Sequence, residues 1–94
     1  MGICFQKLMP HIGTTEMLEK IEKGDFQSIR LRGLQDGTFC LLLECEDGTF
    51  IHENPDGSVK YYPGIDHALI WLKRKAGVVE VIVHTELWKE YKRR

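Results

Sequence analysis

Three copies of one short motif limit what this chain can fold into more than any other sequence feature. Each copy is Asp-Gly followed by Ser or Thr and then an apolar residue, and the copies begin at Asp36, Asp47 and Asp56. Asp-Gly readily adopts the positive φ values of tight hairpin turns, and β-forming residues flank every copy. The motifs therefore predict three successive hairpins that join four antiparallel strands. These strands are expected over residues 26–34, 38–45, 49–53 and 58–62.

The second of these strands has apolar residues on both of its faces. Phe39, Leu41 and Leu43 alternate with Cys40 and Leu42. A strand that is apolar on both sides is typical of the centre of a sheet, where both faces are at least partly covered. We therefore expect this segment to be the central strand.

Two amphipathic segments flank the predicted strands. Thr14 or Thr15 can cap a short helix that ends at Gly24, a residue suited to the left-handed conformation that stops helices. A second helix is expected over residues 65–75, where apolar residues recur at helical spacing. Gly77 ends this second pattern.

The C-terminal part continues with a β-branched run from Val78 to Thr85, which predicts another strand. Residues 86–92 can add one or two helical turns. The predicted order is α-β-β-β-β-α-β(-α), which is an α+β two-layer sandwich on a mainly antiparallel meander sheet. Residues 1–13 show no regular period and are expected to form an irregular N-terminal arm, whereas residues 14–94 form a single α+β domain.

Charge is divided unevenly along the chain. Residues 1–59 carry five basic and ten acidic residues, whereas residues 60–94 carry eight basic and four acidic residues. The net charge is only −1, so no overall field attracts nucleic acid or a membrane. Basic residues interleaved with aromatics can bind single-stranded nucleic acid, although the same aromatics can complete a small core. The candidate contact residues for nucleic acid or a protein partner are Lys60, Tyr62, Lys73, Arg74, Lys75, Lys89, Lys92 and Arg93.

The sequence lacks the motifs of common enzyme classes. It has no phosphate-binding glycine loop, no Cys-x-x-Cys pair and no His-Glu-x-x-His zinc motif. Zinc ligation by Cys45, His52 and His84 is conceivable, but none of these residues has ligand spacing, so ordinary hydrogen-bonding histidines are expected instead. We therefore expect no catalytic residue, metal or cofactor. The three cysteines are expected to be reduced thiols of a cytoplasmic protein, and no apolar run approaches a membrane span.

Several segments match a known layout: residues 18–24, the hairpins at Asp36-Gly37 and Asp47-Gly48, residues 65–72 and residues 78–83. On these segments the chain resembles small bacterial protein families of unknown function that have a helix, a β-meander, a helix and a final strand. The resemblance implies the same α+β fold and no catalytic residue.

These observations favour a non-catalytic protein-binding or regulatory module. The acidic face of the first helix or the basic C-terminal end would serve as its docking surface. One alternative is a nucleic-acid-binding protein that uses the basic, aromatic C-terminal half, and another is a small enzyme with an unrecognised site. Because a free sheet edge invites pairing with another strand, the sequence also predicts a homodimer through a sheet edge.

Overall fold

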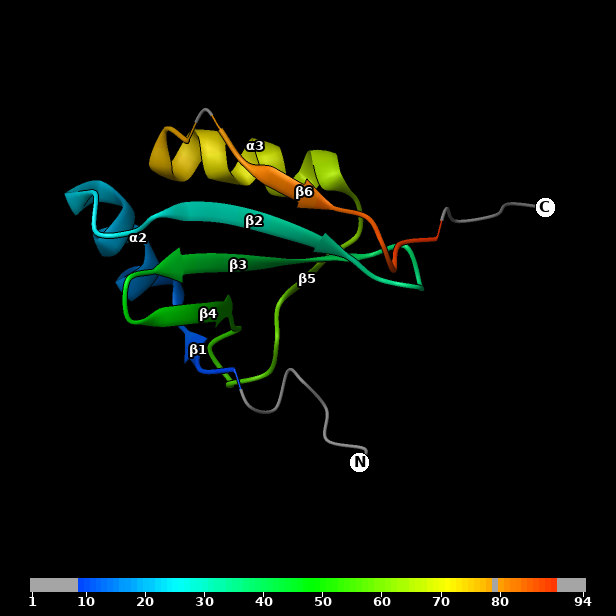
Figure 1. Ribbon diagram of the computed structural model, residues 1–94, viewed down its shortest axis with the longest axis horizontal. Coiled ribbons are helices and arrows are strands. Elements are labelled where there is room, and N and C mark those ends of the chain that lie inside the picture. The colour runs from blue at the N-terminus through cyan, green and yellow to red at the C-terminus, as the bar shows by residue number, and fades with distance from the viewer. Residues whose placement is uncertain (1–8, 79, 90–94) are drawn as a thin grey trace.

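A computed structural model describes residues 9–78 and 80–89 of the 94-residue chain (Figure 1). Within these residues it contains two helices and a mixed sheet of six strands, so the predicted α+β class is confirmed. The elements in chain order are β1 (His11–Ile12), α2 (Thr14–Lys23), β2 (Ser28–Gly33), β3 (Phe39–Cys45), β4 (Gly48–His52), β5 (Tyr61–Tyr62), α3 (Ile65–Ala76) and β6 (Ile82–His84).

The sheet has the strand order β1-β4-β3-β2-β6, with β3 at its centre as the two apolar faces predict. β2, β3 and β4 are antiparallel, and the first two Asp-Gly hairpins join them as expected. β1 and β6 instead pair in parallel with β4 and β2. The sheet is therefore mixed, because each outer strand reaches its neighbour through a connection that contains a helix or crosses the sheet rather than through a hairpin.

The third Asp-Gly motif makes a turn but does not start a fourth meander strand. Asp56 accepts hydrogen bonds from the backbone N–H and the hydroxyl of Ser58, and a single bridge pairs Glu53 with Val59. The chain then leaves β4, and β5 pairs with Phe39 and Cys40 of β3. β4 pairs only with the later part of β3, from Leu42 onward. β5 pairs with the part of the same β3 edge that β4 leaves unpaired.

Both helices confirm the predicted segments but differ from them in how they begin. Each helix follows a glycine, and neither has a side-chain cap. Thr14 does not cap α2, because its hydroxyl is hydrogen-bonded to His52 on β4. Both helices end as predicted, at Gly24 with a φ of 72° and at Gly77 with a φ of 66°.

The two helices cover the same face of the sheet, which gives the two predicted layers. Met17 of α2 and Ala68 and Leu72 of α3 are buried against alternate residues of β2 and β3. The opposite face carries a smaller buried cluster of Cys40, Leu42 and Ile51, against which Met9 and Val59 pack. The main core therefore lies between the sheet and the helices.

The N-terminal arm predicted over residues 1–13 is wrong for its last residues. Backbone hydrogen bonds join Pro10 to Ile51 and Ile12 to Glu53, so the chain pairs with β4 there. Ile12 is 1% exposed and belongs to the main core. Residues 1–8 lie outside the described residues.

The C-terminal elements are shorter than predicted. Among the described residues of the strand expected over 78–85, only Ile82–His84 pairs with β2. Residues 86–89 are not helical, and the rest of the helix predicted over 86–92 lies outside the described residues. Trp88 instead packs on Phe39, with ring centres 6.0 Å apart, and its indole N–H donates to the carbonyl of Gly37 at 3.3 Å.

Candidate functional site

The basic residues singled out in the sequence do not form one surface. Lys73 lies on the flank of α3 that faces the segment before β6, whereas Arg74 and Lys75 line a hollow on the other flank. Lys60 lies near Lys75, because both line one cleft. Lys89 follows β6, and this stretch of chain runs toward the end of the sheet opposite the C-terminal end of α3 (Figure 1).

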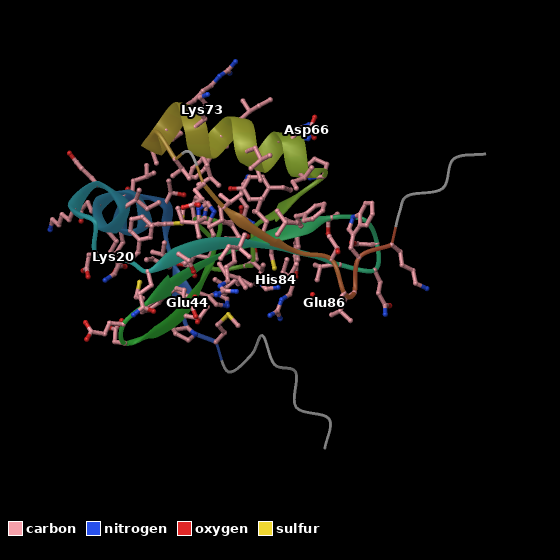
Figure 2. The ribbon with its side chains drawn as sticks, turned by 45° about the horizontal axis from the view of Figure 1, so that its top comes forward. Lys20, Glu44, Asp66, Lys73, His84 and Glu86 are labelled. Carbon is pink, nitrogen blue, oxygen red and sulfur yellow. The ribbon has the colours of Figure 1, made fainter. Side chains whose placement is uncertain are left out.

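The structure does not place the remaining predicted contact residues on the protein surface. Tyr62 is only 4% exposed, and its ring belongs to the core. Lys92 and Arg93 lie outside the described residues. The structure therefore groups Lys60, Arg74 and Lys75 and separates them from the other candidates. Figure 2 shows Lys73 and Asp66 toward the two ends of α3.

The first candidate site is the free edge of β6. β6 is the last strand on its side of the sheet, and no described residue pairs with its outer edge. Its side chains are exposed on both faces, Ile82 by 42% and Val83 by 37%. Leu69, on the neighbouring flank of α3, is 39% exposed and shares a depression of about 190 Å³ with Val81. We call Leu69, Val81, Ile82 and Val83 the β6 edge surface.

The opposite edge of the sheet is better protected. β1 has only two residues and follows Pro10, which cannot donate a backbone hydrogen bond. The side chain of His11 contacts both the Glu53 carboxylate and the Gly57 carbonyl at 3.1 Å. β6 is also short, with three residues, but it contains neither proline nor lysine, and no described residue pairs with its outer edge. β6 is therefore the edge on which another strand can add.

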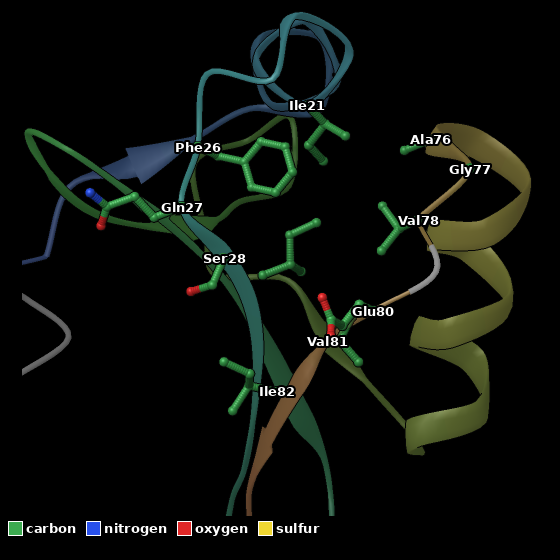
Figure 3. Close-up of a pocket in the computed structure, with 11 residues that line it drawn as sticks. Ile21, Phe26, Gln27, Ser28, Ala76, Gly77, Val78, Glu80, Val81 and Ile82 are labelled. Carbon is green, nitrogen blue, oxygen red and sulfur yellow. The ribbon is translucent and has the colours of Figure 1, made fainter.

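A larger cavity of about 530 Å³ lies beside the start of β6 (Figure 3). β2 and β6 pair only from Arg30 and Ile82 onward, so the chain segments before these residues diverge and leave a groove. Figure 3 shows Phe26 and Ile21 on one side of it and Val78 on the other. Val78 and Val81 line both this cavity and the depression at Leu69. Hollows lined by both apolar and polar side chains therefore lie on both sides of Val78 and Val81.

The second candidate site has an aromatic floor built around His52. His52 is 1% exposed, and its ring centre lies 5.3 Å from that of Trp71 and 6.4 Å from that of Tyr62. Its Nε2 lies 2.8 Å from the Thr14 hydroxyl, and its Nδ1 lies 3.2 Å from the Tyr62 hydroxyl. These contacts tie β4 to both helices and to β5.

Burial determines the protonation states of His52 and Tyr62. Burial, with a smaller effect from the Lys60 ammonium, lowers the pKa of His52 to about 4. Burial raises the pKa of Tyr62 to about 12. His52 is therefore neutral at pH 7, and Tyr62 keeps its proton.

The tautomer of His52 decides whether Thr14 can act as a nucleophile. Within the described residues, the buried Tyr62 hydroxyl has one hydrogen-bond partner, Nδ1 of His52. If Tyr62 donates to Nδ1, then Nε2 carries the proton and donates to Thr14. The reverse arrangement would leave the Tyr62 proton unpaired inside the protein, which is unfavourable. The contacts thus favour a structural Thr14–His52–Tyr62 chain over an activated hydroxyl.

The other sequence candidates for chemistry are dispersed. Within residues 9–78 and 80–89, no three His, Cys, Asp or Glu side chains gather where they could hold a metal ion. Cys40 and Cys45 are buried free thiols, and burial raises the pKa of each. His84 lies on the open face of the sheet, where its Nε2 contacts Arg30 at 2.8 Å. No helix in the described part of the chain is long and apolar enough to cross a membrane.

Glu44 completes a polar network on that open face (Figure 2). It accepts hydrogen bonds from Ser28 at 2.7 Å and from Nε of Arg30 at 2.9 Å. These hydrogen bonds lower the pKa of Glu44. Arg30 also reaches His84, so the network joins β2, β3 and β6 and its charges are mutually satisfied. We assign it to holding the three strands together.

The sequence predicts pairing through a sheet edge, but sequence reasoning did not identify the residues of the β6 edge surface or the role of Trp71. Leu69 continues the apolar stripe of α3, which predicts burial, but it lies at the margin of that stripe and stays exposed. Trp71 lies off the stripe, and this offset is the signal that marks it as a residue between core and surface. No family model, curated protein or solved structure matches this chain, so the resemblance to small bacterial proteins stays a prediction.

Proposed function

We propose that the protein is a non-catalytic binding module that accepts an extended segment of a partner protein along the free edge of β6. The observation that carries this proposal is the combination of an unpaired strand edge with exposed Ile82, Val83 and Leu69. Added strands of this kind bind through backbone hydrogen bonds, and side-chain pockets select among them.

The depression at Leu69 supplies such a pocket. A strand laid along β6 directs alternate side chains to the face that carries α3. The depression there is lined by Leu69, Leu72 and Val81 and holds about 190 Å³. An apolar side chain of the partner would fill it and cover exposed apolar surface, which is favourable by about 25 cal/mol per Å².

The charges around this pocket nearly cancel. Lys73 and Glu80 are the charged residues in its lining, one of each sign. Binding should therefore depend on backbone pairing and apolar contact, with a weak dependence on salt. The partner segment is expected to be extended and to alternate apolar with polar residues.

A random peptide library tests this proposal without knowledge of the natural partner. Peptides selected on the wild-type chain would be labelled and titrated by fluorescence anisotropy. Val83→Lys places a charge in the β6 edge surface and should weaken binding by at least about tenfold, the size of effect seen at the centre of an interface. Leu87→Lys is the matched control, because Leu87 is 53% exposed and lies outside this surface.

Hydrogen exchange locates the bound peptide independently. The backbone amides of β6 should gain protection when the peptide binds. Equal affinity of the wild type and Val83→Lys, with no added protection in β6, would contradict the proposal.

A second copy of the chain is one partner that this edge can take, as the sequence predicts. Sedimentation velocity over a range of concentrations measures that association directly. If a dimer forms through β6, Val83→Lys should convert it to a monomer while Leu87→Lys leaves it unchanged. A monomer at every concentration would rule out this partner and leave the peptide test unaffected.

A further inference from the structure

We infer that the cleft beside Trp71 binds a phosphate monoester of a flat aromatic group, the chemistry of a nucleoside monophosphate. The Trp71 cleft, about 220 Å³ in volume, is lined by Lys60, Lys75, His52 and Trp71 among others. It lies on the flank of α3 opposite the one that borders the β6 edge surface, so this inference is independent of the proposed function.

Two ammonium groups give the cleft its affinity for an anion. Lys75 has no ion pair or hydrogen bond to any described residue. Lys60 makes a cation–π contact, with its Nζ 5.3 Å from the centre of the Tyr62 ring, and has no acidic partner within the described chain. Two cations at one cleft complement a phosphate monoester, which carries between one and two negative charges at pH 7.

The Glu53 carboxylate also lines the cleft, but it does not form an ion pair with either lysine. Oε1 of Glu53 lies 3.1 Å from Nδ1 of His11. Its Oε2 lies 3.9 Å from where a Cβ on Gly13 would be, next to the start of α2. Glu53 is therefore directed toward β1 and the N-terminus of α2, where it contacts His11 and forms no ion pair with Lys60 or Lys75.

Trp71 provides the surface for a flat ring. It lines both the Trp71 cleft and an adjoining hollow of about 280 Å³, whose lining also includes Ile70, Arg74 and Lys75. Ile70 is 50% exposed, so this hollow offers apolar surface beside the indole. Lys75 lines both spaces, whereas Lys60 lines the cleft alone. The phosphate is therefore assigned to the cleft, between the two lysines, and the ring to the hollow. Stacking of a base on an aromatic side chain strengthens binding by about 5- to 150-fold.

The floor of the cleft explains why such a site would stay rigid. His52 holds hydroxyls of α2 and β5 through its two ring nitrogens, and its ring packs on Trp71. Because its pKa is near 4, this floor is uncharged at pH 7 and does not need a counter-ion of its own. Within the described chain, the Trp71 indole N–H has no hydrogen-bond acceptor and remains free to donate to a bound group.

Indole N–H signals in the ¹H–¹⁵N NMR spectrum of the full chain test the inference. The chain has two tryptophans, and Trp88 serves as the internal control because its N–H donates to Gly37 at a distant place. AMP should shift the Trp71 signal along a saturable curve and leave the Trp88 signal in place. Adenosine and inorganic phosphate, titrated separately, should each bind at least about tenfold more weakly than AMP.

Three matched variants locate the phosphate. Lys60→Gln and Lys75→Gln should each weaken AMP binding by about tenfold, the loss expected for one hydrogen bond to a charged group. Lys73→Gln removes the same charge from the other flank of α3 and should leave the affinity unchanged. The rest of each spectrum reports whether the variant is folded.

The outcomes separate cleanly. A Trp71 signal that does not move with AMP overturns the inference, as does equal weakening by Lys73→Gln and Lys75→Gln. Equal binding of inorganic phosphate and AMP also overturns it, because the ring would then be unrecognised. A single-stranded oligonucleotide distinguishes the source: tighter binding than AMP through the same lysines indicates a nucleic-acid strand, and weaker binding indicates a free nucleotide.

Discussion

Protonation of His52 should make the stability of this protein depend on pH between about 6.5 and 4, a range that begins above the one in which carboxylates titrate. The folded state holds His52 neutral with a pKa of about 4, against an ordinary value of 6.5. The unfolded chain therefore binds the proton more strongly. The stabilisation is complete above pH 6.5, is lost progressively as the pH falls, and is gone below about pH 4.

The size of this effect follows from the two pKa values. Each unit of pKa difference is worth about 1.36 kcal/mol, so the full loss is about 3 kcal/mol. About 2 kcal/mol of it is already lost at pH 5, where unfolding takes up almost one proton. A domain of this size is stabilised by only about 5–15 kcal/mol, so the change is easy to measure.

Urea denaturation at several pH values between 8 and 5 provides the measurement. Tryptophan fluorescence should follow unfolding, because Trp71 packs on the His52 ring. His52→Gln removes the titrating group, so the variant should lose less stability than the wild type over this range, by about 2 kcal/mol. Equal losses in the two proteins would refute the reasoning, because His52 would then be solvated or already charged in the folded state.

Three further predictions test the packing and the free edge. Leu72→Ala, at a residue 1% exposed, should cost about 2–5 kcal/mol in chemical denaturation, whereas Leu69→Ala, at 39% exposure, should cost far less; equal costs would contradict the assigned core. Gly33→Ala should destabilise by about 1–3 kcal/mol and redden the Trp88 emission, because the new Cβ would lie 2.6 Å from the Trp88 Cβ. If that contact is the cause, adding Gly33→Ala to Trp88→Gly, which has no Cβ, should cost almost nothing. Val83→Lys should change the free energy of unfolding by no more than about 0.5 kcal/mol while it weakens peptide binding, and a large loss of stability would show that Val83 belongs to the core.

The hairpins and helices could be predicted because their signals are local. Asp36 accepts hydrogen bonds from the N–H and the hydroxyl of Thr38, as the Asp-Gly-Thr motif predicts. The left-handed glycines Gly24 and Gly77 end both helices for the same local reason. β1 and β5 have two residues each, too few to show a period, and their partners lie far away in the sequence. Nothing within such a segment indicates pairing.

The candidate sites were harder to predict because they depend on which flank of a helix each side chain occupies. Lys73, Arg74 and Lys75 read as one basic cluster along the chain. Successive residues of a helix are about 100° apart, so Lys73 and Lys75 differ by about 200° and face opposite flanks. That separation can be calculated from the sequence once the helix is assigned. The proximity of Lys60 to Lys75 cannot be calculated in this way. It arises because the chain leaves β4 after the third turn and β5 then pairs with β3.

The two flanks of α3 differ in the chemistry of their side chains, and the two proposed binding sites follow from this difference. On the β6 flank, Lys73 and Glu80 border an apolar depression and offset each other's charge, which suits a neutral apolar strand. On the other flank, Lys60 and Lys75 border an aromatic floor with one carboxylate, Glu53, which contacts His11 instead of either lysine; two cations against one anion suit an anionic ligand. The helix buries Leu72 between them, and that anchor fixes both flanks relative to the sheet. A single helix of twelve residues thus presents two surfaces of different chemistry because its core contact occupies only one narrow stripe.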